Sequence, residues 1–392
     1  MKISSAKRKV LLVSHAFNDI NLGAARVYIC LHQGLVARNW DADIVYLEEK
    51  DFYPTKFARR IQHKALLPRL MSAKVQKLKL EDYDLIMCSS GMIYPIFKEL
   101  STKSLRPVLV NHVHGLSAYD YATVMTEAHL GTADVSLLFK YVSGPLQIRW
   151  DELGFRYSDI NILQNKRDLS YIENKGILNV ESHIIPPAII DPIYNAVFER
   201  NSIEAAPPSL FWFGSWENRK GAQYLPDAFR RIRERFPDCR LKIGGTGMTT
   251  EKILSFFDAT DRQNISVLGS ISDEEHLRLL SKSTVFLFPS LSEGFGLALL
   301  EAASQGLPAV TVSTGFAADY LRDGVSARIV YPSSLHIAEA VIDLLADPAL
   351  RTTISENARS VARHFSNAEM VSRYEDVFSA AIARRKTRQI AS

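Results

Sequence analysis

The chain has 392 residues, of which 47% are hydrophobic and 23% are charged, and its formal net charge is +4. A single hydrophobic core rarely serves so long a chain, so length and composition predict two domains of a soluble globular protein. No apolar run reaches the roughly 18 residues that a membrane-spanning helix needs, so we expect no such helix.

The N-terminal half alternates short apolar segments with helical patterns. The first apolar run follows a short basic stretch, is too short for a secretory signal, and is interpreted as a strand. Strands are expected over 10–14, 44–47, 85–88 and 108–110, and a helix over 23–37. This alternation predicts a doubly wound parallel sheet, which binds ligands at the carboxyl ends of its strands. The candidate site loops are then 14–23, 89–91 and 112–118.

Residues 52–80 form a segment with eight basic side chains and no acidic one. Its basic residues are Lys56, Arg59, Arg60, Lys64, Arg69, Lys74, Lys77 and Lys79. Leu67, Met71, Val75 and Leu78 form an apolar stripe at helical spacing. The absence of acidic residues favours an amphipathic helix on an anionic membrane surface over a helix packed on the domain. Nucleic acid is not an expected partner, because regular aromatic interleaving and DNA-reading motifs are absent.

The middle of the chain contains the predicted domain boundary. Apolar segments continue at 136–140, 160–163 and 183–187, and a polar stretch then ends in Ala205-Ala206-Pro207-Pro208. That composition is typical of a linker, so we place a first domain at 1–200 and a second at 201–366. A final helix over 368–384 is long enough to return from the second domain to the first within segment 367–392, and its basic end is expected to fray.

The C-terminal half repeats the α/β pattern. Helices are expected over 221–236, from Ser272 onward with Glu275 completing a capping box, and over 334–345 and 348–365. Strands are expected over 210–213, 241–243, 265–268, 285–288 and 309–312, several of them ending at glycines. Glycines at strand ends indicate close approach of the backbone to a ligand.

Cys30, Cys88 and Cys239 are odd in number, far apart and located in or beside apolar segments. This usage predicts buried free thiols in a reducing cytoplasm. No cluster of cysteine and histidine has the spacing of metal ligands, so no metal site is expected.

The strand over 285–288 leads into a glycine-bearing turn and then a helix, from Ser292 to Glu301. Such a turn presents unpaired backbone N–H groups and the positive end of a helix to an anion, often a phosphate. Glu293 and Glu301 bracket the turn, and carboxylates repel phosphate. They are therefore expected to accept hydrogen bonds from hydroxyl groups, which indicates a nucleotide or a sugar nucleotide as the ligand.

Taken in order, these segments resemble the retaining GT-B-fold glycosyltransferases of family 4 (glycosyl transferases group 1). The strongest likeness is the pair Glu293 and Glu301 with Gly294-Phe295-Gly296 between them. Further likenesses lie at 23–26, 114–115, 184–187, 214–221, 244–247, 269–275, 306–308 and Gly315. The resemblance covers nearly the whole chain and implies two Rossmann-like domains that face each other across a cleft containing the site.

The resemblance implies that the second domain binds a nucleotide-diphosphate sugar. Glu301 accepts hydrogen bonds from the ribose, and Glu293 binds hydroxyls of the transferred sugar. Lys220 neutralises the departing diphosphate, which is work that a metal does in other enzymes. His114 lies beside the sugar and completes the implied catalytic set. The other residues implied in substrate binding are Gly23, Arg219, Gly245, Gly247, Val267, Leu268, Gly294, Phe295, Gly296 and Leu297.

Some positions depart from the family pattern. Ser215 stands where members usually have an arginine, and Arg219, next to Lys220, is a candidate replacement. Members have a pair of glycines before the first helix, where this chain has Leu22-Gly23. They have a glycine after the two prolines, where this chain has Ala188. His112 competes with His114 for the histidine role, and the following Gly115 favours His114. Asp120 and Glu127 lie past the histidine loop, where an acceptor could bind, and no role is assigned to them.

We therefore predict a metal-independent, retaining hexosyltransferase that needs no cofactor. The donor is UDP- or GDP-linked, and the acceptor is a hydroxyl of a glycan, a glycolipid precursor or a small molecule. The expected location is the cytoplasm, peripheral to the inner face of the membrane. One alternative is a nucleotide-sugar-dependent isomerase or phosphorylase on the same fold. Another is a non-catalytic nucleotide-sugar-binding protein, which is considered because Ser215 replaces the expected arginine.

Overall fold

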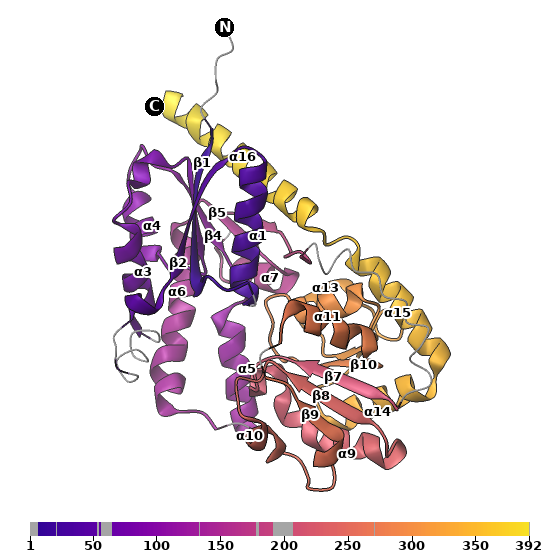
Figure 1. Ribbon diagram of the computed structural model, residues 1–392. Coiled ribbons are helices and arrows are strands. Elements are labelled where there is room, and N and C mark those ends of the chain that lie inside the picture. Colours follow the sequence, from indigo (N-terminus) through magenta and orange to yellow (C-terminus); the bar gives the residue numbers. More distant parts are fainter. Residues whose placement is uncertain are drawn as a thin grey trace. The chain divides into compact units, whose positions relative to one another are not determined.

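The computed structural model describes residues 7–20, 22–52, 55, 65–132, 134–177, 180–190, 207–269 and 271–391. The chain divides into two compact units, each with one sheet flanked by helices (Figure 1). The first unit comprises Met1–Tyr121, Val135–Ala188 and Asn367–Ser392, and the second comprises Ala122–Asp134 and Ile189–Ser366. The predicted boundary between residues 200 and 201 lies outside the described residues.

Six parallel strands form the sheet of the first unit, in the order β2-β1-β3-β4-β5-β6. Their bounds are β1 Lys9–Phe17, β2 Asp41–Leu47, β3 Leu85–Ser89, β4 Val108–His112, β5 Ile160–Leu163 and β6 Glu181–Ile184. β1 pairs with β2 on one side and β3 on the other, so the strand order reverses between β1 and β3. In doubly wound sheets such a reversal marks the usual position of a ligand.

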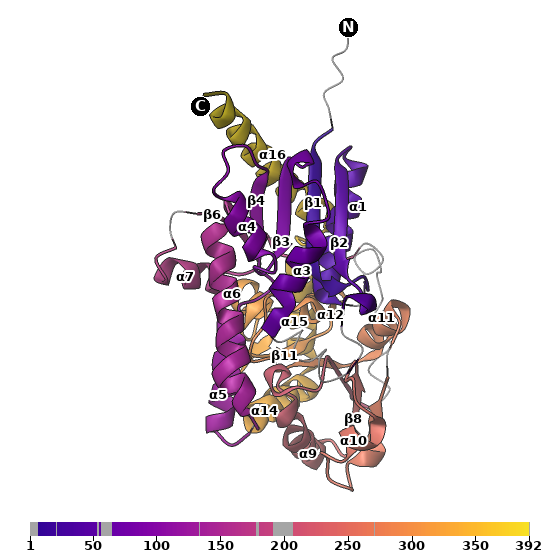
Figure 2. The same ribbon diagram turned by 90° about the vertical axis from the view of Figure 1, so that its left-hand side faces the viewer.

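Helices cover both faces of this sheet. They are α1 Gly23–Ala37, α3 Leu67–Val75, α4 Tyr94–Leu100, the first part of α5 Ser117–His129, α6 Gly144–Tyr157, α7 Lys166–Asn174 and α16 Asn367–Ala391. Figure 1 shows α1 and α16 on one side and α3, α4 and α6 on the other, and Figure 2 shows the latter group in front of the sheet. The inner strands β3, β4 and β5 are buried along their whole length and are mostly apolar, as expected for a sheet covered on both faces, whereas the edge strands β2 and β6 are partly exposed and carry acidic residues.

The apolar stripe of the basic segment lies in the core of the first unit. Leu67, Met71 and Val75 of α3 are buried in the cluster that includes the strand residues Leu11 and Ile86, while Leu78 is 36% exposed. The described part of the segment therefore favours the interpretation of a helix packed on the domain. Lys56, Arg59, Arg60 and Lys64 lie outside the described residues.

The C-terminal basic residues do not fray, and that prediction is wrong. α16 continues to Ala391, and the three side chains contact polar groups of the first unit. Arg384 binds Glu181 at 2.5 Å, Arg385 donates to the carbonyl of Ser104, and Lys386 lies 2.8 Å from Asp84. These partners lie at or before the first residues of the strands β6, β4 and β3. The positions of the basic residues in the sequence did not indicate them.

The second unit contains a six-stranded parallel sheet in the order β12-β11-β10-β7-β8-β9. Its strands are β7 Ser209–Phe213, β8 Arg240–Gly244, β9 Ile265–Val267, β10 Val285–Phe288, β11 Ala309–Thr311 and β12 Arg328–Ile329. Its helices are α9 Leu225–Arg235, α10 Thr250–Leu254, α11 Asp273–Lys282, α12 Leu297–Ser304, α13 Gly315–Tyr320, α14 Ser334–Ala346 and α15 Pro348–Ala362. The strand order reverses between β7 and β10, and the predicted doubly wound α/β architecture is confirmed in both units.

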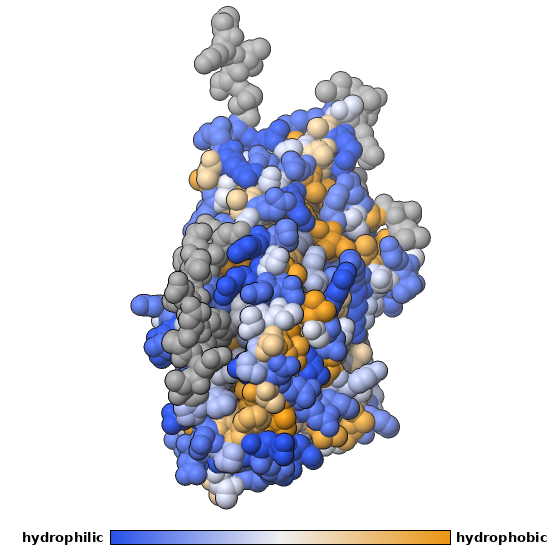
Figure 3. All heavy atoms as spheres, turned by 90° about the vertical axis from the view of Figure 1, so that its right-hand side faces the viewer, coloured by the Kyte–Doolittle hydropathy of each residue, from blue (hydrophilic) through white to orange (hydrophobic). Residues whose placement is uncertain are grey.

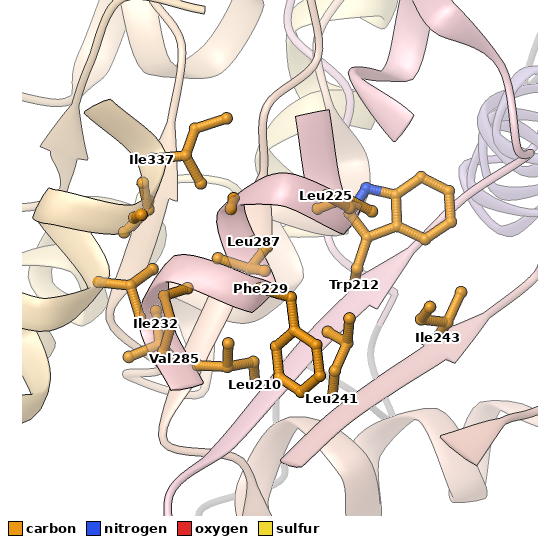
Figure 4. Close-up of a cluster of buried hydrophobic side chains, with 14 of the residues drawn as sticks. Leu210, Trp212, Leu225, Phe229, Ile232, Leu241, Ile243, Val285, Leu287 and Ile337 are labelled. Carbon is orange, nitrogen blue, oxygen red and sulfur yellow. The ribbon is translucent and has the colours of Figure 1, made fainter. Parts of the chain in front are cut away.

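The alternation of side chains along β7 divides the core of the second unit. Leu210 and Trp212 point into the cluster with Phe229 and Ile232 of α9 and with α14 (Figure 4). Phe211 points to the other face, where its ring meets those of Phe286 and His276. Both faces of β7 are therefore buried, as the run of four large apolar residues predicts.

Two further predictions concern the whole chain. The three cysteines are buried and free, which confirms the expected thiols. No helix within the described ranges is both long and apolar enough to span a membrane. On the face seen in Figure 3, hydrophilic residues predominate and apolar residues form separate patches.

Candidate functional site

The loops that follow β7 and β10 are bonded to each other at the reversal of strand order in the second unit. The amide of Leu291 donates to the carbonyl of Arg219 at 2.8 Å, and Nη1 of Arg219 donates to the carbonyl of Ser292 at 3.0 Å. Gly221 has a φ of +71°, and a Cβ atom there would overlap the carbonyl of Pro289. Glycine is therefore required at the point where the two loops touch.

Lys220 and Glu293 form an ion pair across these loops. Nζ of Lys220 lies 2.5 Å from Oε1 of Glu293, and the side chains are 19% and 9% exposed. Burial is the largest influence on the pKa of Glu293 and raises it, but the charges of Lys220 and Arg219 and hydrogen bonds from Lys220 and Ser290 lower it below the ordinary value. The site thus holds an ionised carboxylate beside two cations.

The turn after Glu293 ends in the N-terminus of α12. Gly296 has a φ of +98°, precedes the first helical residue Leu297, and no side chain caps this end. The first N–H groups of a helix have no partner within it and carry partial positive charge, so this end suits an anion. Phe295 supports the turn from below, since its ring packs on Phe316 at 5.4 Å and its carbonyl accepts from the Phe316 amide.

Glu301 lies in the second turn of α12 and is bonded to a residue that the sequence did not indicate. Nε2 of His276 is 3.1 Å from Oε2 of Glu301, and both residues are 4% exposed. The His276 ring also lies 4.5 Å from the ring of Phe213, at the end of β7. In the sequence, His276 lies on the same helical face as the apolar Leu279 and Leu280, which indicates burial but not a partner.

The other predicted binding residues of the second unit lie at the same edge of the sheet. Gly245 and Gly247 follow β8 with φ values of +73° and +68°, and Gly245 lies against the Phe213 ring. Val267 ends β9, and the amide of Leu268 donates to Ile243 of β8 at 2.7 Å. Since β7, β8 and β9 are neighbours, these residues line the strand ends next to Lys220 and Glu301.

Ser215 carries no positive charge, yet a second cation lies near Lys220. The Arg219 guanidinium is fixed by the Ser292 carbonyl and lies 3.7 Å from Glu217. Its charge contributes to the lowered pKa of Glu293. The charge of Arg219 therefore acts on the same carboxylate as the charge of Lys220.

Histidines gather at the reversal of strand order in the first unit. His15 at the end of β1 lies 2.6 Å from Ser89 at the end of β3, through Nδ1 and Oγ. His114 bonds through Nδ1 to Gln164 at 3.1 Å, and its buried Nε2 has no hydrogen-bond partner among the described residues. Burial, followed by the charges of His112 and His15, lowers the pKa of His114 well below its ordinary value, so the ring is neutral.

His112 differs from His114 in its surroundings. It is fully buried, and its Nε2 lies 2.9 Å from the hydroxyl of Tyr374 in α16. Burial, with a smaller contribution from His15, lowers its pKa to about 3. The bond to Tyr374 gives His112 a structural role in its own unit. Each of the two rings keeps one buried nitrogen without a hydrogen-bond partner among the described residues, Nδ1 in His112 and Nε2 in His114.

Gly23 is the first residue of α1, and its exposed backbone lies at a helix end without a side-chain cap. Nε of Arg26 donates to the carbonyl of Ile20 at 2.9 Å and stabilises the preceding loop. Glu127 belongs to the second unit and accepts hydrogen bonds from Thr132, Gln223 and Tyr224. That network gives Glu127 a structural role. Within the described ranges no group of three or more histidines, cysteines or acidic residues could hold a metal ion.

Residues 195–361 match the family model described as Glycosyl transferases group 1, which is less than half of the chain. An uncharacterized glycosyltransferase of Methanocaldococcus jannaschii is 25% identical over 214 residues, which cover 54% of this chain and 58% of the relative. The MMP alpha-(1->4)-mannosyltransferase of Mycolicibacterium hassiacum is 33% identical over 171 residues, which cover 42% of this chain and 41% of the relative. The matches thus span about half the length of these curated relatives.

Solved structures resemble the whole chain. Sucrose-phosphate synthase from Thermosynechococcus elongatus has a TM-score of 0.76 and 16% identity over 96% of this chain and 100% of that one. Anabaena HepE in complex with UDP-glucose has a TM-score of 0.68 and 16% identity over 95% of this chain and 99% of that one. At this identity the likeness concerns the fold alone, and the predicted GT-B fold is confirmed.

Proposed function

We propose that this chain, whose residues 195–361 match the Glycosyl transferases group 1 domain, is a glycosyltransferase that moves a hexose from a UDP- or GDP-linked donor to a hydroxyl acceptor. The observation that carries the proposal is the Lys220–Glu293 ion pair beside the uncapped N-terminus of α12. It combines cations and a helix N-terminus without a side-chain cap, which suit a diphosphate, with a carboxylate that suits sugar hydroxyls.

Lys220 and Arg219 would bind the diphosphate together with the backbone of Phe295, Gly296 and Leu297. Donor binding would draw Lys220 toward the phosphates, and Glu293 would exchange this partner for hydroxyls of the hexose. Because both cations would contact the phosphates once the donor is bound, they would stabilise the negative charge that develops on the leaving nucleotide. This is the contribution that makes a metal unnecessary in the proposed mechanism.

Glu301 would accept hydrogen bonds from the ribose hydroxyls, because its carboxylate lies one helical turn beyond the phosphate-binding end of α12. Val267 and Leu268 would contact the base, and Gly245 and Gly247 would let the backbone approach the nucleoside. In the first unit, we assign the unused Nε2 of His114 to a hydroxyl of the transferred sugar and Gly23 to the donor phosphates.

A panel of UDP- and GDP-linked hexoses, with released nucleotide as the readout, tests the proposal. We expect release with at least one donor, and a decrease of about 100-fold or more in Glu293→Ala, as for the loss of one charge-stabilising group. Unchanged release in that variant would contradict the assignment of Glu293. Retention would be read from the anomeric configuration of the product by NMR, and metal independence from unchanged turnover in EDTA.

Ser215 supports a second candidate, a non-catalytic protein that binds nucleotide sugars. Without the arginine at this position the charge on a departing diphosphate would be less well balanced than in the family that the chain resembles. A protein of this kind would bind a nucleotide sugar and release no nucleotide with any acceptor. Exchange of Ser215 for arginine would then raise affinity without producing turnover.

A further inference from the structure

The hydrogen bond between His276 and Glu301 joins two buried polar side chains of the second unit. Both residues are 4% exposed, and Nε2 of His276 lies 3.1 Å from Oε2 of Glu301. The histidine is held by aromatic rings on its other side, with Phe213 at 4.5 Å and Phe211 at 5.7 Å between ring centroids. The ring therefore cannot turn away without leaving a void beside β7.

The two nitrogens of His276 have different surroundings. Nδ1 is buried and has no hydrogen-bond partner among the described residues, whereas Nε2 faces a carboxylate oxygen. A carboxylate can only accept, so the proton of a neutral ring is placed on Nε2, where it is shared with Glu301. In the other tautomer, the unprotonated Nε2 would face the carboxylate oxygen, so two acceptors would be in contact, and the buried Nδ1–H would have no partner among the described residues.

Stability alone does not account for this arrangement. Replacing a buried polar pair by apolar residues of similar volume is often neutral or stabilising, and both residues lie on helices that pack against the apolar face of β7 and β10. A pair retained there is better explained by a requirement on the orientation of the carboxylate. Glu301 follows the N-terminus of α12, where the proposed function places the nucleotide.

We propose that His276 is a positioning residue, which donates from Nε2 to Glu301 and holds the carboxylate in the orientation that receives the ribose hydroxyls of the donor. The inference rests on the proposed function, because that function supplies the ribose. The contacts continue beyond the histidine. Phe213, which packs on His276, also lies against Gly245 in the loop after β8, so one aromatic side chain supports both the histidine and that loop.

Calorimetry with ribose and dideoxyribose nucleotides tests this role. We would measure the affinities of UDP, GDP and their 2′,3′-dideoxy counterparts for the full chain and for His276→Leu. The preference for the ribose form is expected to decrease by about three- to tenfold in His276→Leu, as for residues coupled in one network. His276→Gln keeps a donor and is expected to recover part of the preference.

Ser272→Ala is the matched control, because Ser272 caps the N-terminus of α11 by accepting from the Glu275 amide. It weakens the helix that carries His276, so a general loss of structure would lower the affinities of both nucleotide forms equally. A ribose preference unchanged in a folded His276→Leu would overturn the inference. Absence of nucleotide binding by the wild-type protein would instead overturn the proposed function.

Histidine-ring NMR of the wild-type protein decides the matter if His276→Leu does not fold. With the His276 signal assigned by its loss in His276→Gln, UDP or GDP should shift the Nε2 resonance, and the dideoxy counterpart should shift it much less. Equal shifts with both forms would refute the positioning role, because the ring would then respond to the nucleotide without reference to the ribose.

Discussion

Replacing Lys220 with methionine removes the cation from the ion pair and keeps most of the side chain. Nζ and Oε1 are 2.5 Å apart, and the side chains of Lys220 and Glu293 are 19% and 9% exposed, so the pair is largely withdrawn from water. Breaking a buried pair by removing one partner costs about 3–5 kcal/mol. Arg219 still attracts the carboxylate, so we expect a loss of about 2–3 kcal/mol in the free energy of unfolding at pH 7.

The loss should depend on pH in a definite direction. In the wild-type protein the pKa of Glu293 is lowered from its ordinary value of 4.5, so the ion pair stabilises the fold above that value and is lost as the pH falls through the folded-state pKa. Without Lys220, the remaining favourable interactions no longer outweigh burial, so the pKa of Glu293 is raised. Protonation then relieves the unpaired charge, and the difference between wild type and variant should be smaller at pH 4 than at pH 7.

Urea unfolding followed by tryptophan fluorescence measures this difference, since Trp212 and Trp216 lie in the core of the second unit. The double variant Lys220→Met with Glu293→Gln removes both charges and should recover much of the lost stability. If Lys220→Met loses less than about 0.5 kcal/mol in the free energy of unfolding, as is typical of an exposed pair, and the loss does not depend on pH, the buried ion pair does not stabilise the fold as proposed.

Three further predictions concern Gly221 and Glu301 of the second unit and His114 of the first. Gly221→Ala should destabilise the second unit by about 2–4 kcal/mol in thermal or urea unfolding, because the new Cβ would meet the Pro289 carbonyl. Gly131→Ala is the control, because Gly131 also has a positive φ but a Cβ there would meet no atom within 4 Å. It should cost about 1 kcal/mol. Glu301→Gln should weaken UDP or GDP binding by about 10- to 100-fold in calorimetry, and equal affinity would contradict the ribose role. His114→Ala should lower kcat, and because burial keeps the pKa of His114 well below 6.5, the wild-type pH–rate profile should show no inflection from this residue near that pH.

Local sequence signals predicted the elements well where they were self-contained. The helix over 23–37 and the strand over 285–288 have the observed bounds, because apolar periodicity and length specify them without long-range partners. The helix that begins after Ser272 has the expected cap, but only half of the capping box. Ser272 accepts from the Glu275 amide, while the Glu275 carboxylate binds Arg278 at 2.6 Å.

Tertiary contacts explain what the sequence could not provide. The stripe at Leu67 and Met71 has the same periodicity whether it faces lipid or a sheet, and only the fold distinguishes the two. His276 has no motif that indicates Glu301, which is 25 residues away in the sequence. Glu127 likewise meets Gln223 and Tyr224 through a contact of long sequence separation, so its structural role was not readable.

We propose that the second unit binds a nucleotide diphosphate through Lys220 and Glu301. The most direct measurement is calorimetry of UDP and GDP on the wild-type chain, on Lys220→Met and on Glu301→Gln. We expect at least one nucleotide to bind the wild-type protein and each variant to bind it at least about tenfold more weakly. Binding of neither nucleotide, or equal binding by all three proteins, would contradict it.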